Sequence, residues 1–305
     1  MTCATAHTGL ASRATAITLG FIGMTMFSGT LPATRVALEG FDPLFITMGR
    51  AVLAAMAAGA ALAVLRPQRP QWADLWRIAA IASCLVVGFP LLTGFAMETV
   101  SAGHGGVVLA IMPIATAVAA TVVGGERPGL WFWLLGAAGA VLVLVFTLSD
   151  AGWRVEPGDI FLLAAAVVAG FGYAFSGKLA RALPGWSVIA WALVLSLPFT
   201  VAGSIVSAPS VWPQSAEVWA GFAYLSLFSM FLGFAFWNMA MAIGGIAKIG
   251  QIQLLQPFVT IAIAAAFTDE TIVPRQLVFA AAVVVVVAAA QRMRVGEAVK
   301  ARPDG

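Results

Sequence analysis

Charged residues are scarce in this sequence. Asp, Glu, Lys and Arg make up 10% of the 305 residues, whereas a typical soluble domain is about a quarter charged. Apolar residues reach 61%, and apolar runs of about 20 residues recur from one end of the chain to the other. This composition excludes a soluble enzyme, a nucleic-acid-binding protein and a disordered chain, and it indicates a polytopic membrane protein.

Motifs for catalysis and for energy coupling are also absent. The two cysteines, Cys3 and Cys84, show neither metal-ligand spacing nor a disulfide framework. The sequence has no Gly-Lys-Ser/Thr phosphate loop, no His-Glu-x-x-His and no Gly-x-Ser-x-Gly. A lipid-modifying enzyme or an assembly subunit would need a polar cluster near the interface, and none is present. We therefore expect no enzyme, no catalytic residue, no metal site and no cofactor.

Ten apolar stretches bounded by charges, proline or glycine predict ten transmembrane helices. They cover residues 14–34, 43–65, 78–97, 104–123, 130–148, 160–177, 187–206, 218–241, 249–268 and 272–290. A cytoplasmic N-terminal tail (1–13) and C-terminal tail (291–305) remain, with no room for a soluble domain. The first stretch is longer than the apolar region of a signal peptide, so we expect it to be retained as a helix.

The basic residues indicate how the helices are oriented. With the N-terminus inside, 12 of the 16 Lys and Arg fall on the cytoplasmic side: Arg13, Arg66, Arg69, Arg77, Arg127, Lys178, Arg181, Lys248, Arg292, Arg294, Lys300 and Arg302. The outer connections hold Arg35, Arg154 and Arg275, while Arg50 lies within the second stretch. Because Lys and Arg concentrate in cytoplasmic loops, the sequence predicts that both termini are cytoplasmic.

A shift of 144 residues reveals an internal repeat. It places Pro113 on Pro257, and each proline is followed thirteen residues later by an acid, Glu126 or Glu270. Other coincidences at a shift of 144 or 143 are Ala96-Met97 with Ala240-Met241, Thr116 with Thr260, His104 with Lys248, and Arg35 with Lys178. Two Ala- and Gly-rich halves can look alike without a repeat, but the recurring Pro-x12-Glu spacing favours one.

Each half, residues 14–148 and 160–290, holds five of the apolar stretches. Because five is odd, the second half must enter the membrane upside down relative to the first. The predicted fold class is therefore all-α, with ten transmembrane helices arranged as two inverted five-helix repeats (5+5). Inverted repeats allow two mirror-related arrangements around a site near the midplane, and hence alternating access.

Several motifs resemble one family of membrane proteins. They are Gly29-Thr30-Leu31-Pro32-Ala33-Thr34-Arg35, Arg50 within Thr47-Met48-Gly49-Arg50-Ala51, the segment Ala96-Met97-Glu98-Thr99-Val100-Ser101-Ala102, and the two Pro-x12-Glu units. Together with ten spans, they resemble the EamA family of the drug/metabolite transporter superfamily, and within it the YddG-like exporters of amino acids and metabolites. The resemblance implies a central cavity lined by spans one, three, four, six, eight and nine, with spans five and ten peripheral.

Polar residues share one face of the ninth stretch. Gln253, Gln256 and Thr260 lie at i, i+3 and i+7. Two amides at membrane depth are not expected to face lipid, where they lack hydrogen-bond partners. They either line a cavity that binds a polar solute or hold neighbouring helices together. The adjacent Pro257, which frees the carbonyl of Gln253, favours the cavity.

The repeat-related face of the fourth stretch is apolar and includes Leu109 and Met112, beside Pro113. We expect Met112 to shape the apolar side of a solute site. Further lining candidates are Trp237, Asn238, Tyr173 and Phe89, although core packing or an interfacial belt is an equal interpretation of the aromatic residues. Pro113 and Pro257 are the expected hinges about which the two halves exchange access.

Two further residues carry chemistry. Arg50 is the one basic residue well inside a span, and an intramembrane charge suggests a functional site. It could also snorkel outward or clamp neighbouring carbonyls or Asp42, and the resemblance implies a place outside the spans that form the central cavity. His104, at the outer start of the fourth stretch, could couple transport to protons because histidine titrates near neutrality, or it is an exposed loop residue.

These observations predict a secondary transporter of the plasma membrane, the inner membrane of a bacterium. By alternating access it would export small polar metabolites, amino acids in particular. The alternative is efflux of drugs or toxic compounds. Proton-driven export of organic cations needs an acid at membrane depth, and the middle third of every stretch lacks Asp and Glu. The expected partners are a small-molecule substrate and the lipid bilayer, with no nucleic acid, in a monomer or a homodimer.

Overall fold

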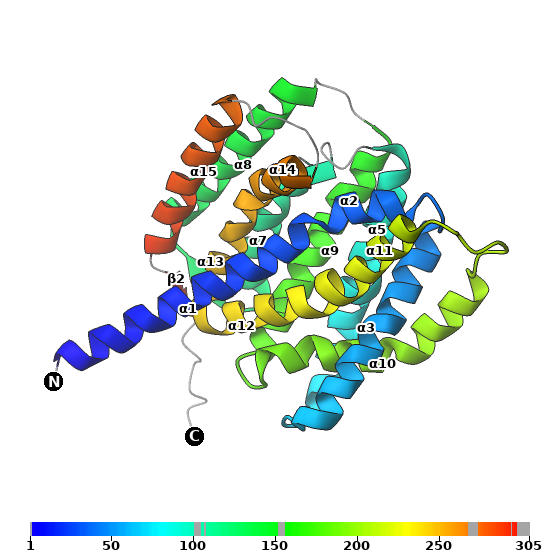
Figure 1. Ribbon diagram of the computed structural model, residues 1–305. Helices are drawn as coiled ribbons and strands as arrows, with labels where there is room; N and C mark the ends of the chain where they lie inside the picture. The colour runs from blue at the N-terminus through cyan, green and yellow to red at the C-terminus, as the bar shows by residue number, and fades with distance from the viewer. Residues whose placement is uncertain are drawn as a thin grey trace.

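The computed structural model describes residues 2–100, 105–106, 108–151, 156–267, 274–293 and 295–297 (Figure 1). The helices of the first half are α1 (Thr2–Ser28), α2 (Thr30–Ala37), α3 (Pro43–Leu65), α4 (Leu75–Ile81), α5 (Phe89–Thr99), α7 (Met112–Val122) and α8 (Leu130–Ala151). Those of the second half are α9 (Gly158–Leu179), α10 (Gly185–Val206), α11 (Ala216–Tyr224), α12 (Phe234–Gly244), α13 (Ile246–Gly250), α14 (Gln256–Phe267) and α15 (Pro274–Arg292). His104 and Glu270 lie outside the described residues.

Within the described residues, six helical stretches are long and apolar enough to cross a membrane: Ser12–Leu38, Pro43–Leu65, Trp72–Thr99, Gly158–Leu179, Gly185–Val206 and Ala216–Gly244. Shorter apolar helices cover Met112–Val122, Leu130–Val145 and Leu277–Arg292. Large apolar side chains such as Ile160, Phe199 and Val206 are exposed on their outer faces, which suits contact with lipid rather than water. The chain is therefore a predominantly helical, multi-pass membrane protein, as the sequence predicted. One difference is that α1 begins at Thr2, within the expected tail.

Irregular turns interrupt the helices at several points. The segments η2 (Ala82–Gly88) and η4 (Leu225–Gly233) are π-helical, while η1 (Trp72–Asp74), η3 (Leu109–Ile111) and η5 (Gln251–Leu255) are 3-10 turns. Pro113 and Pro257 are the second residues of α7 and α14, directly after η3 and η5. Proline is tolerated in a first helical turn because its missing N–H would be unpaired there. The two prolines thus lie where the helix geometry changes.

Helices from distant parts of the chain pack side by side. In Figure 1, α1 runs beside α12 and η4, and α3 lies beside α10. The helices α5 and α7 pack against α9, whereas α8 and α15 pair with each other at one edge. Small residues permit the close approaches: a Cβ on Gly23 would lie 3.0 Å from the carbonyl oxygen of Gly233, and one on Gly170 would lie 2.8 Å from the carbonyl carbon of Ala115.

A buried acid closes one end of the bundle. Glu126, 2% exposed, accepts hydrogen bonds from the amides of Ile246 (2.7 Å) and Ala247 (2.9 Å), and Arg181 donates to it at 2.9 Å. These amides begin α13 just after Gly245, whose φ of +86° separates α13 from α12. Glu126 also starts a short strand, β1 (Glu126–Pro128), which pairs antiparallel with β2 (Val295–Glu297). The acid therefore joins three distant segments of chain.

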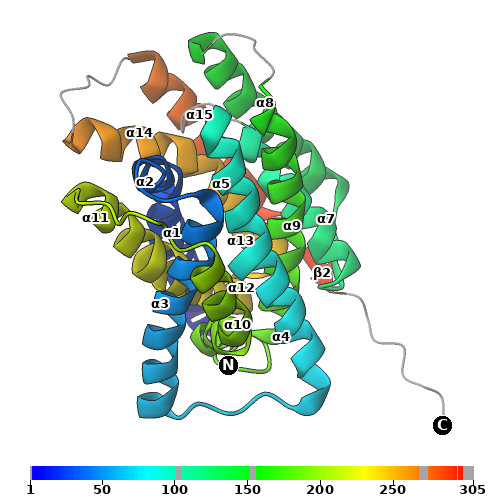
Figure 2. The same cartoon turned by 90° about the vertical axis from the view of Figure 1, so that its right-hand side faces the viewer.

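An arginine ties helices together at the opposite end. Arg35, in the last turn of α2, donates to the carbonyls of Met97 (2.8 Å) and Val100 (3.1 Å) where α5 finishes. Figure 2 shows α2 and the end of α5 towards the top of the bundle, while β2 lies low on the right. The count of basic residues predicts that the Arg35 end is outside and the Glu126 end inside.

Candidate functional site

A small cavity lies among these helices. The residues that form its walls are Phe27 of α1, Thr30 and Leu31 of α2, Arg50 of α3, Phe89 of α5, Leu109 of η3, Met112 of α7, Tyr173 of α9, Ser229 of η4, Phe234 of α12, Gln253 of η5 and Gln256 of α14. The space that the centre of a water molecule can occupy is about 20 Å³, which is room for about one water. The walls must move apart before the cavity admits a larger solute.

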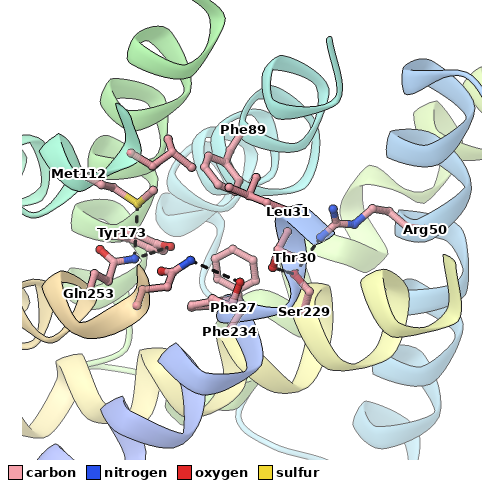
Figure 3. Close-up of a pocket in the computed structure, with 12 residues that line it drawn as sticks. Phe27, Thr30, Leu31, Arg50, Phe89, Met112, Tyr173, Ser229, Phe234 and Gln253 are labelled. Atoms are coloured by element: carbon pink, nitrogen blue, oxygen red, sulfur yellow. Dashed lines mark hydrogen bonds between the residues drawn. The ribbon is translucent and has the colours of Figure 1, made fainter. Parts of the chain in front are cut away.

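Gln253 forms one polar end of the cavity (Figure 3). Its amide nitrogen donates to the hydroxyl of Tyr173 at 3.2 Å and to the sulfur of Met112 at 3.4 Å. The side chain is 5% exposed, and its carbonyl oxygen has no hydrogen-bond partner among the described residues. A buried acceptor without a donor is costly, so this oxygen is available to a donor group on a solute.

Gln256 and Thr260 connect α14 to the end of α1. The amide of Gln256 donates to the carbonyl of Phe27 at 3.3 Å, and the hydroxyl of Thr260 donates to the carbonyl of Ser28 at 2.9 Å. These carbonyls belong to the last turn of α1, where a helix leaves its acceptors unpaired. Gln256 therefore lines the cavity and also joins two helices, whereas Thr260 joins the helices without lining the cavity.

Arg50 forms the other polar end. In Figure 3 its side chain enters from the right, opposite Gln253, with Thr30 and Ser229 beside it. One guanidinium nitrogen donates to the hydroxyl of Ser229 at 3.2 Å, and this hydroxyl lies 2.9 Å from that of Thr30. Arg50 is 2% exposed, so it does not snorkel outward. Nor is it held by Asp42, whose carboxylate caps α3 by accepting from the amide of Phe45.

Aromatic side chains separate the two polar ends. The rings of Phe27 and Phe234 lie 4.9 Å apart, centroid to centroid, in an edge-to-face arrangement. Behind them, Trp237 packs against Phe27 at 5.9 Å and against Tyr173 at 5.7 Å. Edge-to-face pairs hold rings in a defined orientation. The middle of the cavity is therefore an apolar passage lined by packed aromatic rings.

The structure brings together five of the eight residues predicted to bind substrate: Gln253, Gln256, Met112, Tyr173 and Phe89. Trp237 and Asn238 are fully buried behind the wall. Asn238 has no hydrogen-bond partner for either amide atom among the described residues. Pro113 and Pro257 each follow a lining residue, and His104 lies outside the described residues.

Sequence reasoning missed several lining residues. Thr30 and Leu31 belong to the motif Gly29–Arg35, which resembles the family, so the sequence did draw attention to them. No sequence signal pointed to Ser229 or Phe234. Ser229 lies within η4, which is π-helical, and Phe234 directly follows it. A π-helix is wider than an α-helix, so the residues that share a face differ from those that a 3.6-residue period predicts. Arg50 was placed outside the expected cavity, whereas it lines the observed one. The helices α8 and α15 contribute no lining residue.

The site offers binding groups rather than reactive ones. It combines two amides, a phenol, two hydroxyls and a guanidinium with aromatic and aliphatic walls. No group of three or more His, Cys, Asp or Glu that could hold a metal ion occurs within the part of the chain that the structure describes. The lining can hydrogen-bond and enclose a small solute.

Comparison with known proteins identifies relatives with the same architecture. The chain is 46% identical over 254 residues to the "Uncharacterized transporter YdeK" of Bacillus subtilis (strain 168), covering 83% of this chain and 88% of the relative. It is 28% identical over 257 residues to a "Probable terminal-alkyne amino-acid exporter" of Streptantibioticus cattleyicolor, covering 83% and 85%. A solved crystal structure matches with a TM-score of 0.75 at 18% identity, over 91% of this chain and 98% of the other, and shows a shared fold.

The family assignment rests on nearly the whole chain. The EamA-like transporter family matches twice, over residues 14–149 and again over residues 156–290. Both named relatives are bacterial, so the membrane is the bacterial inner membrane. The resemblance noted in the sequence motifs is confirmed: the chain is a multi-pass membrane transporter, not an enzyme, and it belongs to the EamA-like transporter family.

Proposed function

We propose that this transporter exports small polar metabolites, amino acids in particular, through the cavity between Gln253 and Arg50. The observation that carries the proposal is the lining itself, in which hydrogen-bonding groups stand at both ends of a short apolar passage. A solute with a polar backbone and an apolar side chain matches this arrangement. The relative named as an amino-acid exporter supports the same class of solute, at 28% identity.

The proposed architecture is ten transmembrane helices in two inverted repeats with both termini cytoplasmic. The irregular helix turns recur at the 144-residue shift that relates the two halves of the sequence. The π-helical residues 82–88 correspond, at a shift of 144, to residues 226–232 within η4, and the 3-10 turn 109–111 corresponds to 253–255 within η5. The two consecutive family matches support the same division of the chain. Irregular helix turns often mark functional sites, and here they border the cavity.

The small size of the cavity supports the proposal of alternating access. With room for about one water, the site must open towards one side of the membrane at a time. The Glu126 contacts and the Arg35 contacts are suited to hold the two ends closed. In this proposal Pro113 and Pro257 are the hinges, because each lies where a 3-10 turn meets a regular helix beside a lining residue. Proton coupling through His104 remains a prediction.

Efflux of organic cations is the weaker alternative. The cavity is lined by a guanidinium and by no carboxylate among the described residues, so a cation would enter a site that already holds positive charge. A neutral or zwitterionic solute avoids this repulsion. The lining therefore favours metabolite export.

The test is uptake by purified protein in liposomes, with a panel of radiolabelled amino acids and with or without a pH gradient. We expect saturable uptake of a subset of the panel. The substitutions Gln253→Ala and Gln256→Ala should lower uptake about tenfold or more, because each removes a hydrogen-bonding group from the wall. Gln214→Ala, on an exposed loop, is the matched control and should leave uptake unchanged. Unchanged kinetics in both cavity variants, at normal expression, would contradict the site.

A further inference from the structure

We propose that Arg50 is the carboxylate-binding group of this transporter, so that its solutes are small metabolites with a free carboxylate. The inference deepens the proposed function and rests on it. Its starting point is the position of the charge. Arg50 is in the third turn of α3, it is 2% exposed, and it lines the small cavity.

Arg50 differs from the other anchored arginines in its partners. Arg35 donates to two carbonyls, and Arg181 donates to the carboxylate of Glu126. Arg50 makes one side-chain hydrogen bond, to the neutral hydroxyl of Ser229, and its Nε has no partner among the described residues. No described Asp or Glu forms an ion pair with it. A purely structural arginine at membrane depth is expected to be paired with an acid or with backbone carbonyls.

The surroundings of Arg50 match a carboxylate. A guanidinium presents parallel N–H groups that pair with both oxygens of a carboxylate. Ser229 and Thr30 add two hydroxyls 2.9 Å apart at the same end of the cavity, and each hydroxyl can donate a hydrogen bond to an anion. A carboxylate here would supply the missing counter-charge to a buried cation.

The opposite end of the cavity remains for the rest of the solute. The free carbonyl oxygen of Gln253 accepts hydrogen bonds but cannot donate them, so it suits a donor group rather than a carboxylate. Phe27 and Phe234 enclose the passage between the two ends. The solute is therefore oriented, with its carboxylate at Arg50 and its remaining groups towards Gln253.

The experiment compares free acids with their uncharged-carboxyl analogues in the wild-type protein. Uptake into liposomes is measured for leucine, methionine and glutamine, each beside its α-carboxamide. We expect the acids to be transported with a kcat/KM about 10- to 100-fold above that of the amides, the range given by hydrogen bonds to charged groups. Equal transport of acid and amide would overturn the role of Arg50 while leaving the transport proposal intact. Saturable uptake of neither would instead contradict amino-acid transport itself.

Substitution of Arg50 then tests whether this residue causes the preference for free acids over amides. Arg50→Gln should lower kcat/KM for the acids about 10- to 100-fold and leave that for the amides unchanged or higher, because it removes a positive charge from the site. A merely structural role would lower both alike. Arg69→Gln, at an exposed position outside the cavity, is the control. If Arg50→Gln does not reach the membrane, Arg50→Lys is the second variant. It keeps the positive charge, so kcat/KM for the acids should still exceed that for the amides, by a smaller factor than in the wild type.

Discussion

Two buried polar regions of this protein differ in how completely their hydrogen bonds are satisfied. At Glu126, two backbone amides and the guanidinium of Arg181 donate to one carboxylate. In the cavity, the carbonyl oxygen of Gln253 and the Nε of Arg50 have no partner among the described residues. Glu126, Gln253 and Arg50 are each 5% exposed or less, so the burial of these side chains does not by itself explain the difference.

This difference indicates two roles for buried polar groups in the protein. A satisfied network holds helices in one arrangement, because each member would be left unpaired if another moved away. A site with unpaired polar groups can bind a solute, because the solute can supply the missing hydrogen-bond partners. In the proposed function, the Glu126 region stabilises the fold, whereas the cavity leaves polar groups unpaired so that they can bind a solute.

The largest expected effect comes from breaking the satisfied network. Glu126→Ala leaves the buried amides of Ile246 and Ala247 without their acceptor and removes the ion pair with Arg181. A buried group that loses its hydrogen-bond partner costs about 1–3 kcal/mol, and two amides are affected, so we expect a large fall in the free energy of unfolding and little folded protein. Thermal unfolding of the purified protein in detergent measures it.

The matched control is Glu98→Ala, which removes an acid at an exposed position. It should unfold within about 0.5 kcal/mol of the wild type, as exposed substitutions usually do. If the two variants are equally stable, the network at Glu126 does not hold the helices together and the contrast between the two regions fails.

A smaller effect on stability is expected from the cavity. Gln253→Leu replaces an amide whose carbonyl oxygen is unpaired by an apolar group of similar size. The exchange removes an unpaired oxygen but also the donor to the buried hydroxyl of Tyr173, and leaving one buried group without its partner costs about 1–3 kcal/mol. The free energy of unfolding should therefore fall by less than in Glu126→Ala, which leaves two amides without their acceptor, while uptake is lost. Unfolding and uptake are measured on the same preparation. A loss of stability as large as that of Glu126→Ala would show that Gln253 is structural.

The contrast also explains which features the sequence could predict. The helix α3 coincides with its predicted range, residues 43–65, because local signals fix both ends. Asp42 caps its first turn, Pro43 is its first residue, and Arg66 leaves the helix in a left-handed conformation. Features of this kind depend on a few neighbouring residues and are visible in one sequence.

The composition of the cavity depends on contacts that local signals do not determine. Gln253 was predicted because two glutamines interrupt an apolar stretch. Arg50 was recognised as a buried charge, but its direction depends on how α3 packs against η4. Ser229 lies within a π-helical segment, where the usual helical period no longer assigns a face. The rotation of each helix about its axis is set by tertiary packing, so these contacts required the structure.

The smallest expected effect tests how far the satisfied network extends. Lys248 lies in α13, borders a cavity with Glu126 and Arg181, and is outside the six long membrane-spanning stretches. Burial lowers the pKa of Lys248 below its ordinary value of 10.5, and Arg13 lowers it further, while Glu126 opposes them. Between the lowered pKa and 10.5 the unfolded chain binds more protons than the folded one, so stability should rise with pH in that alkaline window.

The measurement is the melting temperature of the wild type relative to Lys248→Gln, from pH 7 into the alkaline range. The variant keeps the bond from Gln291 to the backbone carbonyl of residue 248, so the comparison isolates the ammonium group. We expect the melting temperature of the wild type to rise relative to that of the variant as pH rises, because the cost of burying the charged lysine disappears when it loses its proton. The opposite trend would mean that Glu126 dominates the surroundings of Lys248. In that case the ammonium of Lys248 would be a favourable member of the Glu126 network, beside the amides of Ile246 and Ala247.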